Sequence, residues 1–104
     1  MLKEGDRIPE FSLLGDDGNI YTNESIKGKK TVIYFYRRSN TPGCTKEAQS
    51  FQRVYDMLIN NGINVIGISP DKQSAQIKFK EKYELPFILL SDEDKSVADK
   101  FGAY

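Results

Sequence analysis

A single cysteine, Cys44, is the residue of this chain best suited to covalent chemistry. It follows Thr41, Pro42 and Gly43, after a strand-like run and a polar bend. A threonine suited to an N-cap and a proline suited to the first helical position predict a helix that starts at Thr41, with Cys44 in its first turn. Backbone N–H groups there lack intrahelical partners and the helix dipole is positive, so the thiolate is favoured over the thiol. We therefore expect a reactive thiol at Cys44.

The composition excludes mechanisms in which a histidine or a second cysteine assists the Cys44 thiol. The 104-residue sequence contains no histidine and one cysteine. The lack of histidine excludes a Ser-His-Asp triad, a Cys-His dyad and an HExxH zinc helix. A single cysteine excludes an intrachain disulfide, a CxxC redox pair and a cysteine-rich zinc site. We expect thiol chemistry that relies on Cys44 alone, with no metal and no other cofactor.

Three other loop chemistries fail on spacing. A C-x5-R phosphatase loop needs an arginine where the chain has Ser50, and a CxxC pair needs a cysteine where it has Glu47. A P-loop lies between a strand and a helix, whereas the Gly-Lys-Lys-Thr run at 28–31 precedes the strand. None of these sites is supported by the sequence.

Size and charge set the broad class. The chain is long enough for one domain, over residues 1–104. Lys+Arg and Asp+Glu both number 15, so no basic excess favours nucleic acid or an anionic membrane. No apolar run approaches the roughly 20 residues of a membrane span, and the first residues lack the layout of a signal peptide. We expect a cytoplasmic protein without nucleic-acid or membrane partners.

The elements that must position Cys44 follow from hydrophobic periodicity. Short strands at 11–14 and 20–22 flank an Asp-Gly turn and predict a hairpin. An unbroken apolar run at 31–36 predicts a central strand covered on both faces. Apolar spacing of three and four predicts a long helix from Thr41 to about Asn60. This order places Cys44 beyond the carboxyl end of a strand, where open α/β sheets bind their ligands.

The second half of the chain repeats this alternation. A strand is predicted at 63–68, parallel to 31–36, and Ser69-Pro70-Asp71 is interpreted as the cap and first turn of a helix over about 72–82. Ala75, Phe79 and Tyr83 give this helix a thin apolar face, and its Lys, Glu and Gln residues predict a solvated surface. A strand at 87–90 and a helix carrying Val97, Ala98 and Phe101, ended by Gly102, complete an α/β layering.

Tyr34-Phe-Tyr36 followed by Thr41-Pro-Gly-Cys-Thr45 resembles the peroxidatic site of AhpC/TSA-like peroxiredoxins, most closely the bacterioferritin-comigratory or peroxiredoxin Q group. Further similarity extends over 5–11, 64–69 and 82–92, so nearly the whole chain is covered. The resemblance implies a thioredoxin-like α/β fold with an amino-terminal β-hairpin. It also implies a truncation at the carboxyl end.

The resemblance further implies thiol-dependent peroxidase activity. Cys44 would be the peroxidatic nucleophile, which attacks the O–O bond of hydrogen peroxide or an alkyl hydroperoxide and becomes a sulfenic acid. Thr41 would hydrogen-bond the peroxide and the thiolate, although its hydroxyl also suits a plain N-cap. Pro42 and Gly43 would belong to the substrate-binding site mainly because they set the backbone shape there. The backbone amides of Gly43 and Cys44 would stabilise negative charge on the peroxide oxygen. Thioredoxin or another thiol would be the reductant.

Three departures from the family pattern modify this expectation. Arg37 stands where the family usually has a proline, and Gln49 stands where many members carry a resolving cysteine, which implies a one-cysteine cycle with an external thiol. The family continues past residues 101–104 with further strands, a helix and an active-site arginine. We expect an incomplete domain with an open sheet edge suited to self-association. The alternatives are a catalytically impaired binding module and a thiol redox sensor.

Overall fold

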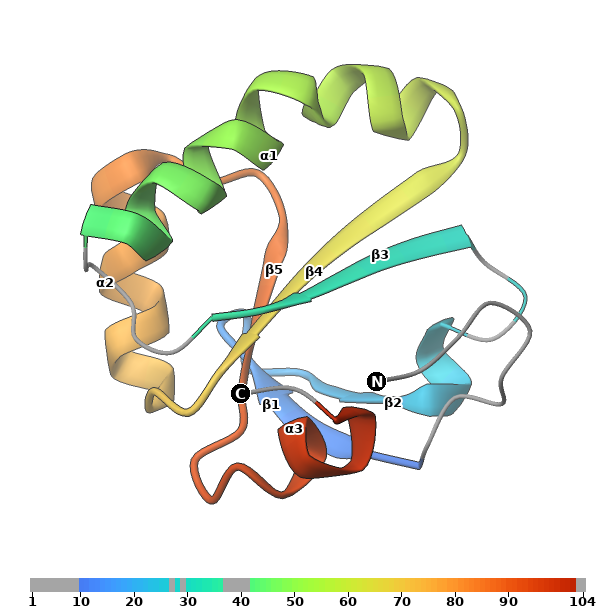
Figure 1. The fold of residues 1–104 in the computed structure, drawn as a ribbon, viewed down its shortest axis with the longest axis vertical. Helices are drawn as coiled ribbons and strands as arrows, with labels where there is room; N and C mark the ends of the chain where they lie inside the picture. Colours follow the sequence, from blue (N-terminus) through green and yellow to red (C-terminus); the bar gives the residue numbers. More distant parts are fainter. Residues whose placement is uncertain (1–9, 27, 29, 37–41, 103–104) are drawn as a thin grey trace.

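The structure is a computed structural model that describes residues 10–26, 28, 30–36 and 42–102. Five strands form one mixed sheet in the order β2-β1-β5-β4-β3 (Figure 1). The parallel pairs β3–β4 and β4–β5 are joined by antiparallel β1–β5 and β1–β2 pairs. The bounds are β1 Ser12–Gly15, β2 Ile20–Thr22, β3 Lys30–Phe35, β4 Ile63–Ser69 and β5 Ile88–Ser91. The predicted hairpin and the parallel pairing of the 31–36 and 63–68 runs are confirmed.

The prediction that 31–36 is a central strand is wrong. Among the described residues, β3 pairs only with β4 and forms one edge of the sheet. Tyr34 packs into the core on one face of the sheet, and Ile33 and Phe35 pack against the core on the other. The apolar run therefore reports correctly that both faces are covered. Coverage of the faces does not determine whether a neighbouring strand lies alongside, so the sequence pattern could not distinguish a central strand from this edge.

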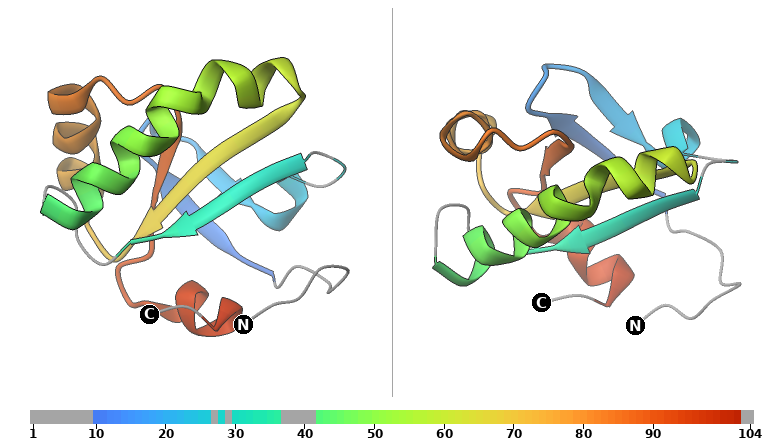
Figure 2. Two further views of the ribbon diagram at one scale, coloured as in Figure 1. Left: turned by 45° about the horizontal axis from the view of Figure 1, so that its top comes forward. Right: turned by 90° about the horizontal axis from the view of Figure 1, so that it is seen from above.

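Helices cover both faces of the sheet, as the two views of Figure 2 show. The helices α1 (Pro42–Asn60) and α2 (Gln73–Tyr83) pack on one face, where the core contains Tyr34, Phe79 and Leu89. The short helix α3 (Ser96–Phe101) and the 3-10 turn η1 (Asn23–Ile26) pack on the other face. The fold is the predicted α/β layering. No helix in the described ranges is long and apolar enough to cross a membrane.

The start of α2 differs from the prediction. The helix begins at Gln73, and the residue before it, Lys72, makes no side-chain cap. Ser69 is instead the last residue of β4, where it pairs with Ser91, and its hydroxyl donates to the Asp71 carboxylate at 2.7 Å. Strand pairing has therefore extended β4 by one residue and removed Ser69 from the helix start.

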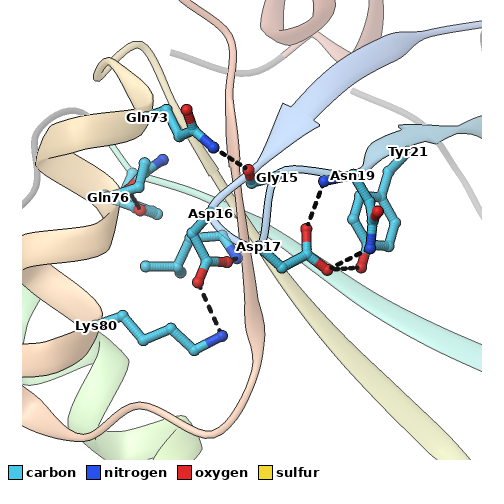
Figure 3. A network of polar contacts seen from close by, with 10 residues as sticks. Gly15, Asp16, Asp17, Asn19, Tyr21, Gln73, Gln76 and Lys80 are labelled. Atoms are coloured by element: carbon cyan, nitrogen blue, oxygen red, sulfur yellow. Dashed lines mark hydrogen bonds and ion pairs between the residues drawn. The ribbon is translucent and has the colours of Figure 1, made fainter.

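The prediction of a solvated polar side for α2 is correct only in part, because Lys78, Glu81 and Lys82 are exposed whereas two other polar residues are not. Gln76 is fully buried, and Lys80 forms an ion pair with Asp16 at 2.9 Å (Figure 3). Hydropathy alone assigns glutamine and lysine to solvent. Here the turn between β1 and β2 and the sheet supply the hydrogen-bond and charge partners that make burial of these groups favourable.

The last helix is held by Asp92. Its two carboxylate oxygens accept hydrogen bonds from the backbone N–H groups of Val97 at 3.1 Å and Ala98 at 2.9 Å. These are first-turn groups without intrahelical partners, and the carboxylate is fully buried against them. Gly102 ends the helix with φ 72°, as predicted. This packing closes the face of the sheet opposite the cysteine.

Candidate active site at the first turn of α1

Cys44 is the third residue of α1, which confirms the prediction that it lies in the first turn of a helix. The thiol is free and half-buried, and the two preceding residues, Pro42 and Gly43, are exposed. Backbone N–H groups in this turn point out of the helix without intrahelical acceptors. Thr41 and Arg37, which were singled out in the sequence, lie outside the described residues.

Aromatic side chains form a floor under the first half of α1. Cys44 packs against the core cluster that contains Tyr34, Tyr36 and Ala48. The Tyr34 ring stacks on Phe51 with a centroid distance of 4.5 Å and on Tyr36 at 5.6 Å. We call Tyr34, Tyr36 and Phe51 the aromatic floor. Because these rings are packed on one another, they give the turn that carries Cys44 a firm support.

The Tyr34 hydroxyl is buried without a hydrogen-bond partner among the described residues. Burial raises the pKa of Tyr34 well above its ordinary value, and the negative charges that Tyr36, Glu47 and Cys44 can carry raise it further. Tyr34 therefore remains protonated and neutral at physiological pH. A Cβ on Gly67 would lie 2.9 Å from this hydroxyl, so the glycine is what allows the ring to lie across β4.

Tyr36 has a different polar environment. Its hydroxyl donates to Oε1 of the buried Gln76, and its backbone N–H donates to the carbonyl of Ile68 at 2.9 Å. The residue is 3% exposed and its ring also packs on Phe79. Tyr36 thus fixes the carboxyl end of β3, which precedes the loop that leads to Cys44.

A groove of about 600 Å³ runs along α1 from Gly43 to Val54. Its lining is Gly43, Lys46, Glu47, Ser50, Phe51 and Val54. A second cavity, of about 320 Å³, includes Thr31 and Asn64, which lie at the amino ends of β3 and β4. Cys44 follows the opposite end of β3. The groove therefore lies on the helix that carries Cys44, although Cys44 is not part of its lining, and the second cavity lies toward the opposite end of the parallel strands.

Two other residues of α1 are placed away from the thiol chemistry. Gln49, at the position of a resolving cysteine, is exposed. Arg53 is also exposed and donates to the Ser50 hydroxyl at 3.2 Å, a contact within the helix surface. The half-buried thiol, the first-turn amides and the aromatic floor therefore constitute the described part of the site.

Sequence reasoning missed Gln76 and the buried hydroxyl of Tyr34. Strand alternation places Tyr34 and Tyr36 on one face, and that signal was available. The burial of Gln76 depends on contacts with β4 and β5, which lie 7 and 14 residues away in sequence. A pattern confined to one helix does not report such contacts.

Comparison with known proteins agrees with this geometry. The AhpC/TSA family model matches residues 4–104. Peroxiredoxin Bcp of Bacillus subtilis is 40% identical over 96% of this chain, and the chloroplastic peroxiredoxin Q of Suaeda salsa is 44% identical over 97%. The chain spans 64% and 47% of the lengths of these two relatives.

Solved structures give the same assignment. Peroxidoxin BcpB from Mycobacterium tuberculosis superposes with a TM-score of 0.91 at 33% identity, covering 98% of this chain and 67% of that one. A Xanthomonas campestris peroxiredoxin Q mutant superposes with a TM-score of 0.85 at 30% identity, covering 88% and 59%. The thioredoxin-like fold, the hairpin and the sheet order are thus shared with longer proteins, and the chain belongs to the AhpC/TSA family of peroxiredoxins, in the Bcp/peroxiredoxin Q group.

Proposed function

We propose that this chain carries the peroxide-reducing half of a thiol-dependent peroxidase. The observation that carries the proposal is the half-buried Cys44 in the first turn of α1, in a chain matched over residues 4–104 by the AhpC/TSA model. Residues 1–104 would form a single peroxiredoxin-like domain, incomplete relative to its longer relatives.

In the proposed reaction, the Cys44 thiolate attacks one oxygen of a hydroperoxide. The S–O bond forms as the O–O bond breaks, Cys44 becomes a sulfenic acid, and the leaving oxygen takes up a proton to give water or an alcohol. Thr41 would donate a hydrogen bond to the peroxide, Pro42 and Gly43 would shape the substrate site, and the first-turn amides would stabilise the developing negative charge. No histidine is required.

The cycle would be completed by external thiols, because the sequence holds one cysteine. A first reductant thiol would displace water from the sulfenic acid to form a mixed disulfide, and a second thiol would release Cys44. Thioredoxin is the reductant class that we propose from the family resemblance. We also propose a cytoplasmic location for this chain; the Suaeda salsa relative is a chloroplastic protein by its name.

Chemical trapping tests the function directly. After exposure to one equivalent of hydrogen peroxide, a dimedone-type reagent should label Cys44, as located by peptide mass spectrometry, because sulfenic acid is the product of the proposed step. Cys44→Ser should give no label. The alternatives of a non-catalytic binding module or a slow redox sensor are favoured instead if labelling is no faster than that of free cysteine.

A further inference from the structure

Gln76 is a fully buried amide whose hydrogen-bonding capacity is well used. Its Oε1 accepts from the Tyr36 hydroxyl, and its Nε2 donates to the Ser69 hydroxyl at 2.9 Å and to the Leu90 carbonyl at 2.8 Å. One acceptor and both donors of the amide therefore have partners. A satisfied buried network of this kind fixes the groups that it joins, because any displacement leaves polar atoms unpaired in a dry environment.

The helix that presents Gln76 is itself anchored at two other points. Gln73 donates to the Gly15 carbonyl at 3.2 Å, and Lys80 pairs with Asp16, whose other carboxylate oxygen accepts from the Leu89 N–H at 2.9 Å (Figure 3). These contacts tie one side of α2 to the β1–β2 turn and to β5. Gln76 lies between Gln73 and Lys80 on the helix, so its side chain is held in place and can in turn hold the Tyr36 hydroxyl.

Tyr36 connects this fixed point with the cysteine in two ways. Through space, Tyr36 belongs to the core cluster on which Cys44 packs. Through the chain, five residues, 37–41, separate Tyr36 from Pro42, where α1 begins. A shift of Tyr36 would therefore displace both the surface under the thiol and the point from which the chain leaves the sheet toward it.

We propose that Gln76 is a positioning residue for Cys44, acting through the hydroxyl of Tyr36. This inference rests on the proposed peroxidase function and extends it to α2, which does not touch the thiol. Attack on an O–O bond needs the sulfur, the peroxide and the stabilising donors in line, so a small displacement of the thiol slows it. Alkylation by a small reagent needs mainly an accessible thiolate and depends much less on alignment.

The test compares Gln76→Leu with the matched control Gln73→Leu on the same helix. Gln76→Leu should lower the second-order rate constant for oxidation of Cys44 by hydrogen peroxide about tenfold, with alkylation by iodoacetamide changed less than about twofold. The Tyr36 amide proton should exchange faster with solvent, as measured by NMR, while amides in the middle of β4 keep their protection. Gln73→Leu loses one anchor of α2, the bond to Gly15, but no bond to Tyr36, and Gln76 and Lys80 still hold the helix, so all three measurements should change far less than in Gln76→Leu.

Tyr36→Phe removes the same hydrogen bond with a smaller change of side chain. If Gln76→Leu does not fold, Tyr36→Phe is measured in its place. It removes the hydroxyl and leaves one acceptor of Gln76 unpartnered. If Gln76 acts through Tyr36, each single substitution should slow peroxide oxidation, and the double variant should be no slower than Gln76→Leu alone, because both remove the same bond.

Several results would overturn the inference. These are equal losses of peroxide and iodoacetamide reactivity, a uniform rise in exchange over the whole sheet, or a Gln73→Leu variant as slow as Gln76→Leu. If the unmodified chain reacts with peroxide no faster than free cysteine, the proposed function fails. In that case the hydrogen-exchange rate of the Tyr36 amide is the remaining test of the positioning role. A selective increase of this rate in Gln76→Leu supports the role, and an unchanged rate overturns it.

Discussion

At the scale of single residues, the Tyr34 hydroxyl lies buried beneath the helix that carries Cys44, without a partner in the part of the chain that the structure describes. A buried polar group without a partner lowers stability, since the unfolded chain leaves it hydrogen-bonded to water. The ring itself stabilises the fold, because it stacks on Phe51 and contacts Phe87 edge-on, with 5.8 Å between the two ring centroids. The hydroxyl and the ring of Tyr34 therefore contribute to stability with opposite signs.

Tyr34→Phe should raise the free energy of unfolding at neutral pH by about 1 kcal/mol, because it keeps the ring and removes the unpaired hydroxyl. The raised pKa of Tyr34 predicts a pH dependence as well. Above about pH 10 the unfolded chain releases the tyrosine proton and the folded protein retains it, so unfolding becomes more favourable as pH rises. Tyr34→Phe should lose less stability than the unmodified chain over that range.

Urea unfolding at neutral pH and at about pH 11 measures both effects. Tyr55→Phe is the matched control, because Tyr55 packs on the same core but is only half-buried and is not among the unpartnered groups. It should change the free energy of unfolding by less than about 0.5 kcal/mol. An unchanged or lowered stability of Tyr34→Phe at neutral pH would contradict the stated cost of the hydroxyl.

At the scale of elements, β3 forms one edge of the sheet. Within the described part of the chain, it pairs with β4 on one side and with no strand on the other. An edge of this length presents backbone groups that can pair with another chain. Val32, near the middle of β3, is half-buried and belongs to neither core cluster, so a charge there tests the edge without opening the core.

We expect the chain to self-associate through β3, and sedimentation velocity across a range of protein concentrations should show an increasing mean mass. Val32→Lys should reduce this association, because a lysine on an edge strand disfavours edge-to-edge pairing. Ile20→Lys is the matched control on β2, the opposite edge of the sheet, where Ile20 is 58% exposed. A mass independent of concentration, or association lost only in Ile20→Lys, would refute pairing through β3.

The elements also show where sequence reasoning succeeds. The hairpin, α1, β4 and β5 follow from local signals: a turn at Asp17-Gly18, a proline at a helix start, and apolar runs of strand length. The start of α2 and the burial of Gln76 depend on pairing between Ser69 and Ser91 and on acceptors from other strands. Local propensity does not contain that information. For the same reason, the sequence located Cys44 but not the network that joins Tyr36 to α2.

At the scale of the whole molecule, the three layers place Cys44 beyond the carboxyl end of β3, with α1 and α2 on its side of the sheet and α3 on the other (Figure 1). This is the edge at which α/β sheets bind ligands. The chain spans about half to two-thirds of the lengths of its relatives. Peroxide reactivity of these residues on their own is therefore the decisive property to measure.

The rate constant for oxidation of Cys44 by hydrogen peroxide tests the central claim most directly. The chain contains no tryptophan, so the reaction cannot be followed by intrinsic tryptophan fluorescence. Competition with a reporter enzyme that consumes peroxide measures the rate constant instead. The account predicts a rate constant at least about a hundredfold above that of free cysteine at the same pH, since alignment and charge stabilisation add to thiolate reactivity. A rate equal to that of free cysteine would contradict it.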